Sequence, residues 1–214
     1  MSRLLAFLRN ARGATAAEFA LLLPVALLIL LGIVDVGRYA WELNQVEKAV
    51  QAGSRYAVAT RLVAQGLNSW DSYQCNGAPL EKGDRICRDA LGTCSSAGGA
   101  ASCVCTTAPC PSDLAASNEA FTAIVSRMRV FAPRLRAEDV TVRYSGSGIG
   151  YAGDPAVDDD DLPLSDIAPV VSVAAVPRGF RFFSLLGAEI NRRDLFPTVS
   201  ASLTLEDGAG TRAN

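Results

Sequence analysis

The stretch GATAAEFALLLPVALLILLGIVDVGR, residues 13–38, decides how the rest of the 214-residue chain is interpreted. No residue between Phe19 and Val34 is charged, and three arginines precede the stretch: Arg3, Arg9 and Arg12. Positive charges ahead of an apolar helix stay on the cytoplasmic side of a membrane. The order therefore predicts a membrane-inserted N-terminal helix, with the remainder of the chain on the outer side.

The leader differs from an ordinary secretory signal in where its charged part ends. That part stops at Gly13, ahead of the apolar run, and the apolar run continues into a longer helical pattern. Cleavage after the apolar run, as in a secretory signal, would cut this helix in two. Cleavage between Gly13 and Ala14 would instead leave the apolar segment at the new N-terminus. We therefore expect a leader over residues 1–13; an uncleaved signal anchor is the alternative.

Glu18 is an acidic residue at the start of an otherwise apolar helix. An acidic side chain at the centre of a membrane helix is unfavourable by roughly 2.5–3.5 kcal/mol, so a chance glutamate is seldom retained. Its charge is favourable near a helix N-terminus. Cleavage would add the new amine of Ala14, one helical turn away. The residues alone leave these partners open.

The segment Gly13–Phe19 looks like the processing site of class III (type IV prepilin-like) leaders. Residues 12–60, including Asp35-Val36-Gly37-Arg38, resemble the TadE-like family of tight-adherence (Flp-type) pilus assembly proteins. The stretch 200–207 is similar to the family less specifically. The resemblance implies cleavage after Gly13 by a prepilin peptidase, and a role as a minor pilin or pseudopilin of a Gram-negative secretion-type machine.

The same resemblance implies the partners and the location. The partners would be other pilin or pseudopilin subunits, the prepilin peptidase, an inner-membrane assembly platform and the membrane itself. The amine that pairs with Glu18 would belong to a neighbouring subunit. The chain would lie in the inner membrane with a periplasmic head, and would enter a cell-surface pilus.

The helical pattern is expected to extend over residues 14–66, with the membrane segment at about 17–36. Pro24 should kink or locally open it, either as a tolerated membrane proline or as a packing feature. Beyond Asp35 the pattern becomes amphipathic, with small and apolar residues at spacings of three and four: Val46, Ala49, Val50, Gly53 and Ala57. We expect residues 46–64 to pack on the chain's own head, residues 67–214, and residues 19–40 to pack on other subunits.

Six cysteines gather in the polar, glycine-rich segment 70–112: Cys75, Cys87, Cys94, Cys103, Cys105 and Cys110. Outside the cytoplasm such a cluster indicates disulfides, which would be the main source of order in a loop that lacks apolar residues. A zinc site would need pairs spaced C-x2-C, and the sequence has none. The pairing stays open, although Cys103 and Cys105 point alike along an extended chain.

The remaining pattern predicts an α+β head. A helix is expected over 114–132, with a cap at Ser112-Asp113, and strands over 139–144, 170–176 and 198–205. A short helix is expected over 182–186. These elements would form a small antiparallel sheet with a packed helix, joined to the long N-terminal helix and to the cysteine-rich loop.

Two motifs in the connection after the first of these strands indicate little chemistry. Gly148–Gly153 matches G-x-G-x-x-G, but the dinucleotide fingerprint needs a helix to begin there, and an acidic run follows instead. In that run Asp158 and Asp160 are candidate calcium ligands, yet the spaced D-x-D-x-D-G pattern is missing. Charge runs are usually solvated, so we expect neither a metal nor a cofactor.

The composition also limits the function. The chain has no histidine, which removes Ser-His-Asp and Cys-His chemistry as usually built, and its net charge of −2 shows no basic excess for nucleic acid. We expect no enzyme and no nucleic-acid partner. The leading interpretation is a minor pilin that assists filament assembly, priming or capping. The alternative is a pilus-anchored adhesin whose loops contact a surface, and loop deletions would separate the two.

Overall fold

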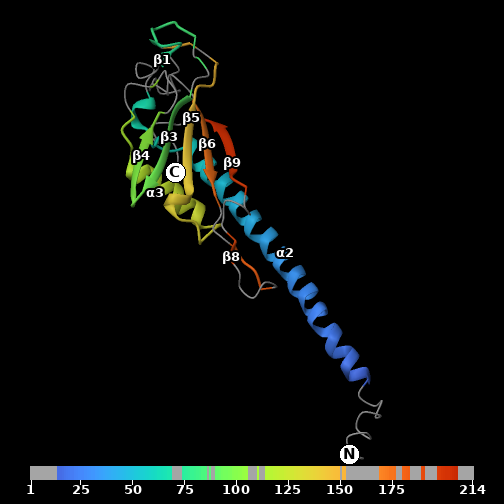
Figure 1. Cartoon of the computed structure of the whole chain (residues 1–214). Coiled ribbons are helices and arrows are strands. Elements are labelled where there is room, and N and C mark those ends of the chain that lie inside the picture. The colour runs from blue at the N-terminus through green and yellow to red at the C-terminus, as the bar shows by residue number, and fades with distance from the viewer. Residues whose placement is uncertain are drawn as a thin grey trace, which may run out of the picture.

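A long helix that extends well beyond a mixed head dominates the structure (Figure 1). The computed structural model describes the following residues: 14–68, 74–85, 87, 90–105, 110, 114–149, 151–152, 169–176, 180–183, 189–190 and 197–206. The fold is α+β, as predicted. The leader 1–13, the predicted cap at Ser112-Asp113 and the acidic run 158–161 lie outside the described residues.

The long helix α2 spans Ala14–Val58 and remains helical through Pro24. It ends before the predicted bound at residue 66, and the reason lies in the head. The backbone N–H of Gln65 donates to the carbonyl of Ala115 at 3.0 Å, and the N–H of Ser117 donates to the carbonyl of Val63 at 2.7 Å. These pairings hold residues 63–65 in an extended course, which is incompatible with another helical turn. The short 3-10 helix η2 (Gln65–Asn68) follows.

The head is built on a five-stranded antiparallel sheet with the order β4-β3-β5-β6-β9. The strands are β4 (Ala100–Val104), β3 (Ala90–Ala97), β5 (Val140–Ser145), β6 (Val170–Ala175) and β9 (Val199–Thr204). The three predicted strands correspond to β5, β6 and β9. The cysteine-rich segment 70–112 was expected to be a loop, and for β3 and β4 within it that expectation was wrong.

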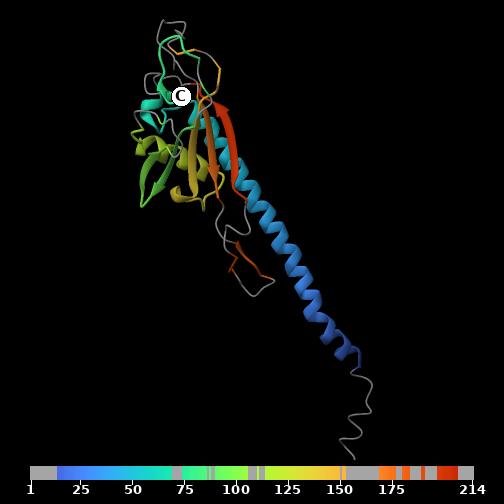
Figure 2. The same ribbon diagram turned by 45° about the horizontal axis from the view of Figure 1, so that its top comes forward.

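Two small antiparallel pairs lie outside this sheet. Strand β1 (Gln74–Cys75) pairs with β2 (Ala78–Pro79), and β7 (Phe180–Arg181) pairs with β8 (Glu189–Ile190). The helix predicted over 182–186 is wrong for Phe182 and Phe183, which follow β7 in a non-helical turn, and its remainder lies outside the described residues. In both overall views the β7–β8 hairpin extends past the sheet toward the N-terminal half of α2 (Figures 1 and 2).

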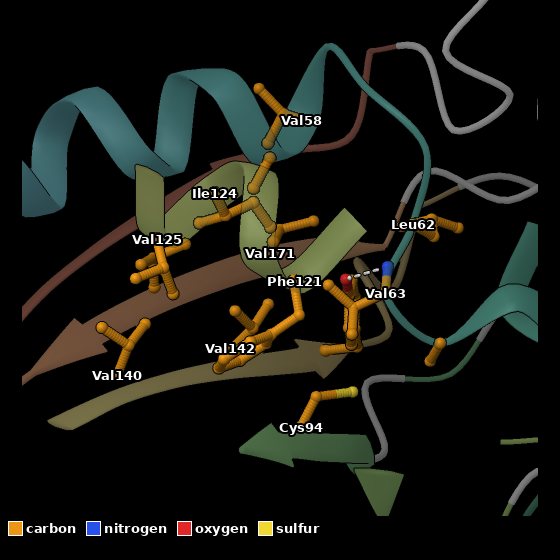
Figure 3. Close-up of a cluster of buried hydrophobic side chains, with 14 of the residues drawn as sticks. Val58, Leu62, Val63, Cys94, Phe121, Ile124, Val125, Val140, Val142 and Val171 are labelled. Carbon is orange, nitrogen blue, oxygen red and sulfur yellow. Dashed lines mark hydrogen bonds between the residues drawn. The ribbon is translucent and has the colours of Figure 1, made fainter. Parts of the chain in front are cut away.

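Helices α2 and α3 (Asn118–Arg129) cover one face of the sheet (Figure 3). Helix α3 begins at Asn118 rather than at Leu114 because residues 115–117 pair with the segment after α2. Ser117 caps it, its side chain accepting from the N–H of Ala120 at 3.2 Å. The apolar face predicted for this helix is buried: Phe121, Ile124, Val125 and Met128. A second 3-10 turn, η4 (Ala137–Asp139), leads into β5.

Strand β5 shows how the sheet separates its two faces. Val140, Val142 and Tyr144 are buried under the helices, whereas Thr141 and Arg143 point to the opposite face. This alternation is typical of an antiparallel sheet with one solvated face. The Tyr144 hydroxyl accepts a hydrogen bond from the N–H of Val63 at 3.0 Å, drawn as the dashed line in Figure 3. Burial raises the pKa of Tyr144 above its ordinary value.

Candidate functional site

The N-terminal half of α2 carries a continuous exposed apolar surface. Its large exposed side chains include Phe19, Leu21, Leu22, Leu23, Val25, Leu27, Leu28, Ile29, Leu30, Leu31, Ile33, Val34 and Val36. Within the described part of the chain, α2 is the one helix long and apolar enough to cross a membrane. A patch of this kind is unfavourable in water and marks a contact with lipid or protein.

Glu18 lies near the start of this surface and is exposed. Ala14 is the first residue of α2, so helical geometry places Glu18 one turn along from it on the same face. Gly13 lies outside the described residues, so cleavage after it stays a prediction.

The apolar surface ends at Asp35, which the head covers. Asp35 is only 2% exposed. Its Oδ1 accepts from Nη1 of Arg38 at 3.2 Å and from the backbone N–H of Phe183 at 3.0 Å. The Arg38 guanidinium carbon also lies 4.1 Å from the centroid of the Phe183 ring, a cation–π geometry. The acidic residue at the end of the apolar run is therefore satisfied by one cation of α2 and by the β7–β8 hairpin.

Sequence reasoning missed this contact because 148 positions separate Asp35 from Phe183. Residues 19–40 were expected to pack on other subunits. At Asp35 and Arg38 the structure instead shows a contact with the chain's own head. Further along the helix, Glu42 forms an ion pair of 2.8 Å with Arg134, which follows α3. The head thus contacts α2 well before residue 46.

The C-terminal half of α2 packs on the head, as its pattern predicts. Ser54 and Val58 are buried in this half, and so are all five residues of the amphipathic stripe: Val46, Ala49, Val50, Gly53 and Ala57. Gly53 faces α3 so closely that a Cβ there would lie 2.6 Å from Cγ of Met128. A Cβ at this position would therefore require the Met128 side chain to shift.

The six predicted cysteines are joined in three disulfides: Cys75–Cys87, Cys94–Cys103 and Cys105–Cys110. Cys94 and Cys103 are direct partners in the β3–β4 register, so their bond fixes the edge strand β4 to the sheet. Cys94 is also fully buried. The cysteine-rich segment therefore supplies part of the core and is not a loop held by cross-links alone.

Two hairpin turns in that segment could have been predicted from the sequence. Asn76-Gly77 joins β1 to β2, and Gly98-Gly99 joins β3 to β4, all four with positive φ. Asn-Gly and Gly-Gly are the pairs preferred in two-residue hairpin turns. The sequence also places Cys94 and Cys103 at equal distances from Gly98-Gly99, which is the arrangement of directly opposed residues in a hairpin.

The weaker motifs bring no ligands together in the part of the chain that can be described. There, no three His, Cys, Asp or Glu side chains lie grouped as metal ligands would. Asp158 and Asp160 are not among these residues. Residues 151–152 are not helical, and Tyr151 forms an isolated bridge with Arg85.

Comparison with known protein families gives a match, and it lies on the long helix. The model of the TadE-like protein family matches residues 13–55, which confirms the resemblance inferred from the sequence. The match covers most of α2 and none of the sheet. No curated protein and no solved structure gave a match. A TadE-like segment implies involvement in tight-adherence pilus assembly, with other pilus components as partners and an association with the membrane.

Proposed function

We propose that this chain is a minor pilin or pseudopilin of a tight-adherence pilus or related secretion machine. In this proposal the membrane segment holds the chain in the inner membrane, with the head in the periplasm. Prepilin peptidase removes residues 1–13, and an inner-membrane platform transfers the subunit into a filament. There the chain assists assembly, priming or capping and catalyses no reaction.

One observation carries the proposal, namely that a single helix has two different surroundings. Its C-terminal half packs one face against the head, whereas its N-terminal half exposes an apolar surface that no other described part of the chain covers. Lipid and the equivalent helices of neighbouring subunits both suit such a surface. A subunit built in this way can exchange lipid for protein contacts without unfolding its head.

The role of Glu18 is the sharpest point of the proposal. In the membrane its carboxylate is unfavourable, whereas in a filament it would pair with the amine that cleavage creates on Ala14 of a neighbour. Glu18→Ala should therefore leave insertion intact, because it makes the segment more apolar, but it should strongly reduce incorporation into filaments. Glu47→Ala is the matched control, since Glu47 is an exposed glutamate on the same helix.

The experiment compares sheared filaments with the membrane fraction from cells that make the pilus. Intact mass of the filament-associated form should begin at Ala14. Retention of Met1 or Ser2 there would contradict the cleavage, and normal incorporation of Glu18→Ala would contradict the assembly role. Labelling of unreduced protein should find no free thiols if the head matures outside the cytoplasm.

A pilus-anchored adhesin remains the alternative. It would use the acidic run and the cysteine region as contact surfaces. Although β3 and β4 belong to the core sheet, β4 is its edge strand and alternates exposed residues along its length, so this strand and the turns are available for contact. Replacing 158–161 with a neutral linker of equal length should leave filament formation unchanged. Loss of surface attachment alone would favour the adhesin.

A further inference from the structure

The β7–β8 hairpin lies where the apolar part of α2 ends. Its strands come between β6 and β9 in the chain, and in both views they lie beyond the end of the sheet, on the side of the N-terminal half of α2 (Figures 1 and 2). The hydrogen bond from the Phe183 N–H to Asp35 fixes its level on the helix. The side chain of Phe183 is 53% exposed although the hairpin is anchored.

The apolar run of α2 is shorter than the hydrocarbon core of a bilayer, and the hairpin contacts α2 where the run ends. At the helical rise, Phe19–Val34 is about 24 Å long, whereas the hydrocarbon core of a bilayer is ~30 Å thick. One more helical turn, residues 35–38, would complete the span, so Asp35 would lie just inside the edge of the core. Its carboxylate is tolerable there because Arg38 and the Phe183 N–H satisfy it and the hairpin covers it.

The side chains at this level have the chemistry of a membrane–water interface. Trp41 is 62% exposed on α2, Tyr39 is half-buried, and Phe183 lies over the Arg38 guanidinium. Trp and Tyr are enriched at the headgroup level of bilayers, with arginines that reach outward. Two segments far apart in sequence therefore present aromatic groups within about two helical turns of Asp35, near the end of the exposed apolar surface.

We propose that the β7–β8 hairpin is a second membrane contact, which inserts Phe183 into the headgroup–acyl boundary of the outward-facing leaflet. The occupant is a phospholipid surface, since the hairpin continues the surface that α2 exposes to lipid. In this arrangement the head rests on the bilayer at two places, and Asp35 lies beneath the hairpin. The inference rests on the proposed membrane anchorage of α2.

The test uses the full chain in vesicles of phosphatidylcholine and phosphatidylglycerol. The chain has two tryptophans, Trp41 and Trp70. Replacing both with Phe and adding Phe183→Trp gives a single reporter that keeps an aromatic ring beside Arg38. Ile149→Trp in the same background is the matched control, because Ile149 is 73% exposed and lies elsewhere on the head. Retaining only Trp41 reports on the helix.

Lipids brominated near the top of the acyl chain should quench the Phe183→Trp emission as strongly as that of Trp41, and should leave the Ile149→Trp emission unchanged. Flotation with the vesicles tests the anchor separately. Failure to float would count against the proposed function. Flotation with quenched Trp41 but unquenched Phe183→Trp would overturn the hairpin contact alone. If the Phe183→Trp side chain is shielded from water only at high protein density, and bromine does not quench it, the occupant is a neighbouring subunit. This result would also overturn the hairpin contact with lipid.

A measurement without substitutions guards against a misfolded reporter. A phospholipid with a photoreactive group at the top of its acyl chain should label two parts of the unmodified chain, the apolar part of α2 and the peptide that contains Phe183. Label confined to α2 would refute the contact. Label that spreads equally to the peptide containing Ile149 would refute it too, because the head would then be lying on the membrane nonspecifically.

Discussion

The two halves of α2 are continuous and helical, yet they are surrounded differently. Val25 in the first half is 55% exposed, whereas Val50 in the second half is fully buried under the sheet and α3. The same residue type on the same helix is therefore held by different interactions. In the second half the chain supplies its own partners, and for the first half we expect the partners to be lipid or other subunits. The stability of the head and the attachment to the membrane should be separable by mutation.

The largest expected effect comes from placing a charge in each half. Val50→Asp buries an unpaired carboxylate in the head and should lower its free energy of unfolding by more than about 4 kcal/mol. Val25→Asp should leave the head folded and disfavour insertion by about 2.5–3.5 kcal/mol. Thermal unfolding followed by near-UV circular dichroism measures the first effect, and flotation with vesicles measures the second. If the two variants destabilised the head equally, the two halves of α2 would not have separate roles.

The buried half is also fixed by a hydrogen bond just beyond its end. Tyr144→Phe removes the acceptor of the Val63 N–H and leaves that buried group unsatisfied, which should destabilise the head by about 1–3 kcal/mol. Tyr151→Phe is the control, because Tyr151 is exposed. Urea unfolding in detergent measures the difference, and similar losses in the two variants would show that the hydrogen bond contributes little.

The pH dependence of the same tyrosine has a definite sign. Burial raises the pKa of Tyr144 in the folded state, whereas the unfolded value stays at about 10. The stability that this group contributes is therefore complete below about pH 10 and falls as the pH rises beyond it. Tyr144→Phe should show a shallower alkaline loss than Tyr151→Phe. Parallel alkaline curves for the two variants would contradict the burial of this hydroxyl.

The exposed and the buried halves of α2 were both predictable from the sequence, for one reason. Periodicity and charge report on the surroundings of a helix, so the uncharged run and the stripe from Val46 to Ala57 gave the correct assignment. Strands β5, β6 and β9 followed from their alternation in the same way. The end of α2 was not predictable, since pairing between residues 63–65 and 115–117 sets it, and these segments are distant in sequence.

The missed strands show a different limit. Strands β3 and β4 contain few large apolar residues, so composition favoured a loop, although Gly98-Gly99 and the flanking cysteines marked a hairpin. The contact between Asp35 and Phe183 had no local signal at all. Sequence reasoning therefore found the site on the helix and missed the part of the head that covers its end.

The smallest expected effect concerns a pair of glycines, one in each half. Gly53→Ala places a Cβ 2.6 Å from Cγ of Met128. Overpacking of this kind is unfavourable by about 1–3 kcal/mol, and the better helix propensity of alanine offsets about 1 kcal/mol of it. A net loss of about 1 kcal/mol in the unfolding free energy of the head should remain. Gly32→Ala should leave it unchanged, because a Cβ at Gly32 meets nothing within 4 Å.

The cause of the Gly53 effect can be isolated with Met128. In the double variant Gly53→Ala/Met128→Ala the clash is absent, so the combined loss should be smaller than the sum of the single losses by at least about 0.5 kcal/mol. If the two single losses were additive, a clash with Met128 would not be the cause of the Gly53→Ala effect. Gly32→Ala then tests the exposed half in the filament. If incorporation falls while the stability of the head is unchanged, another helix approaches Gly32 as closely as α3 approaches Gly53.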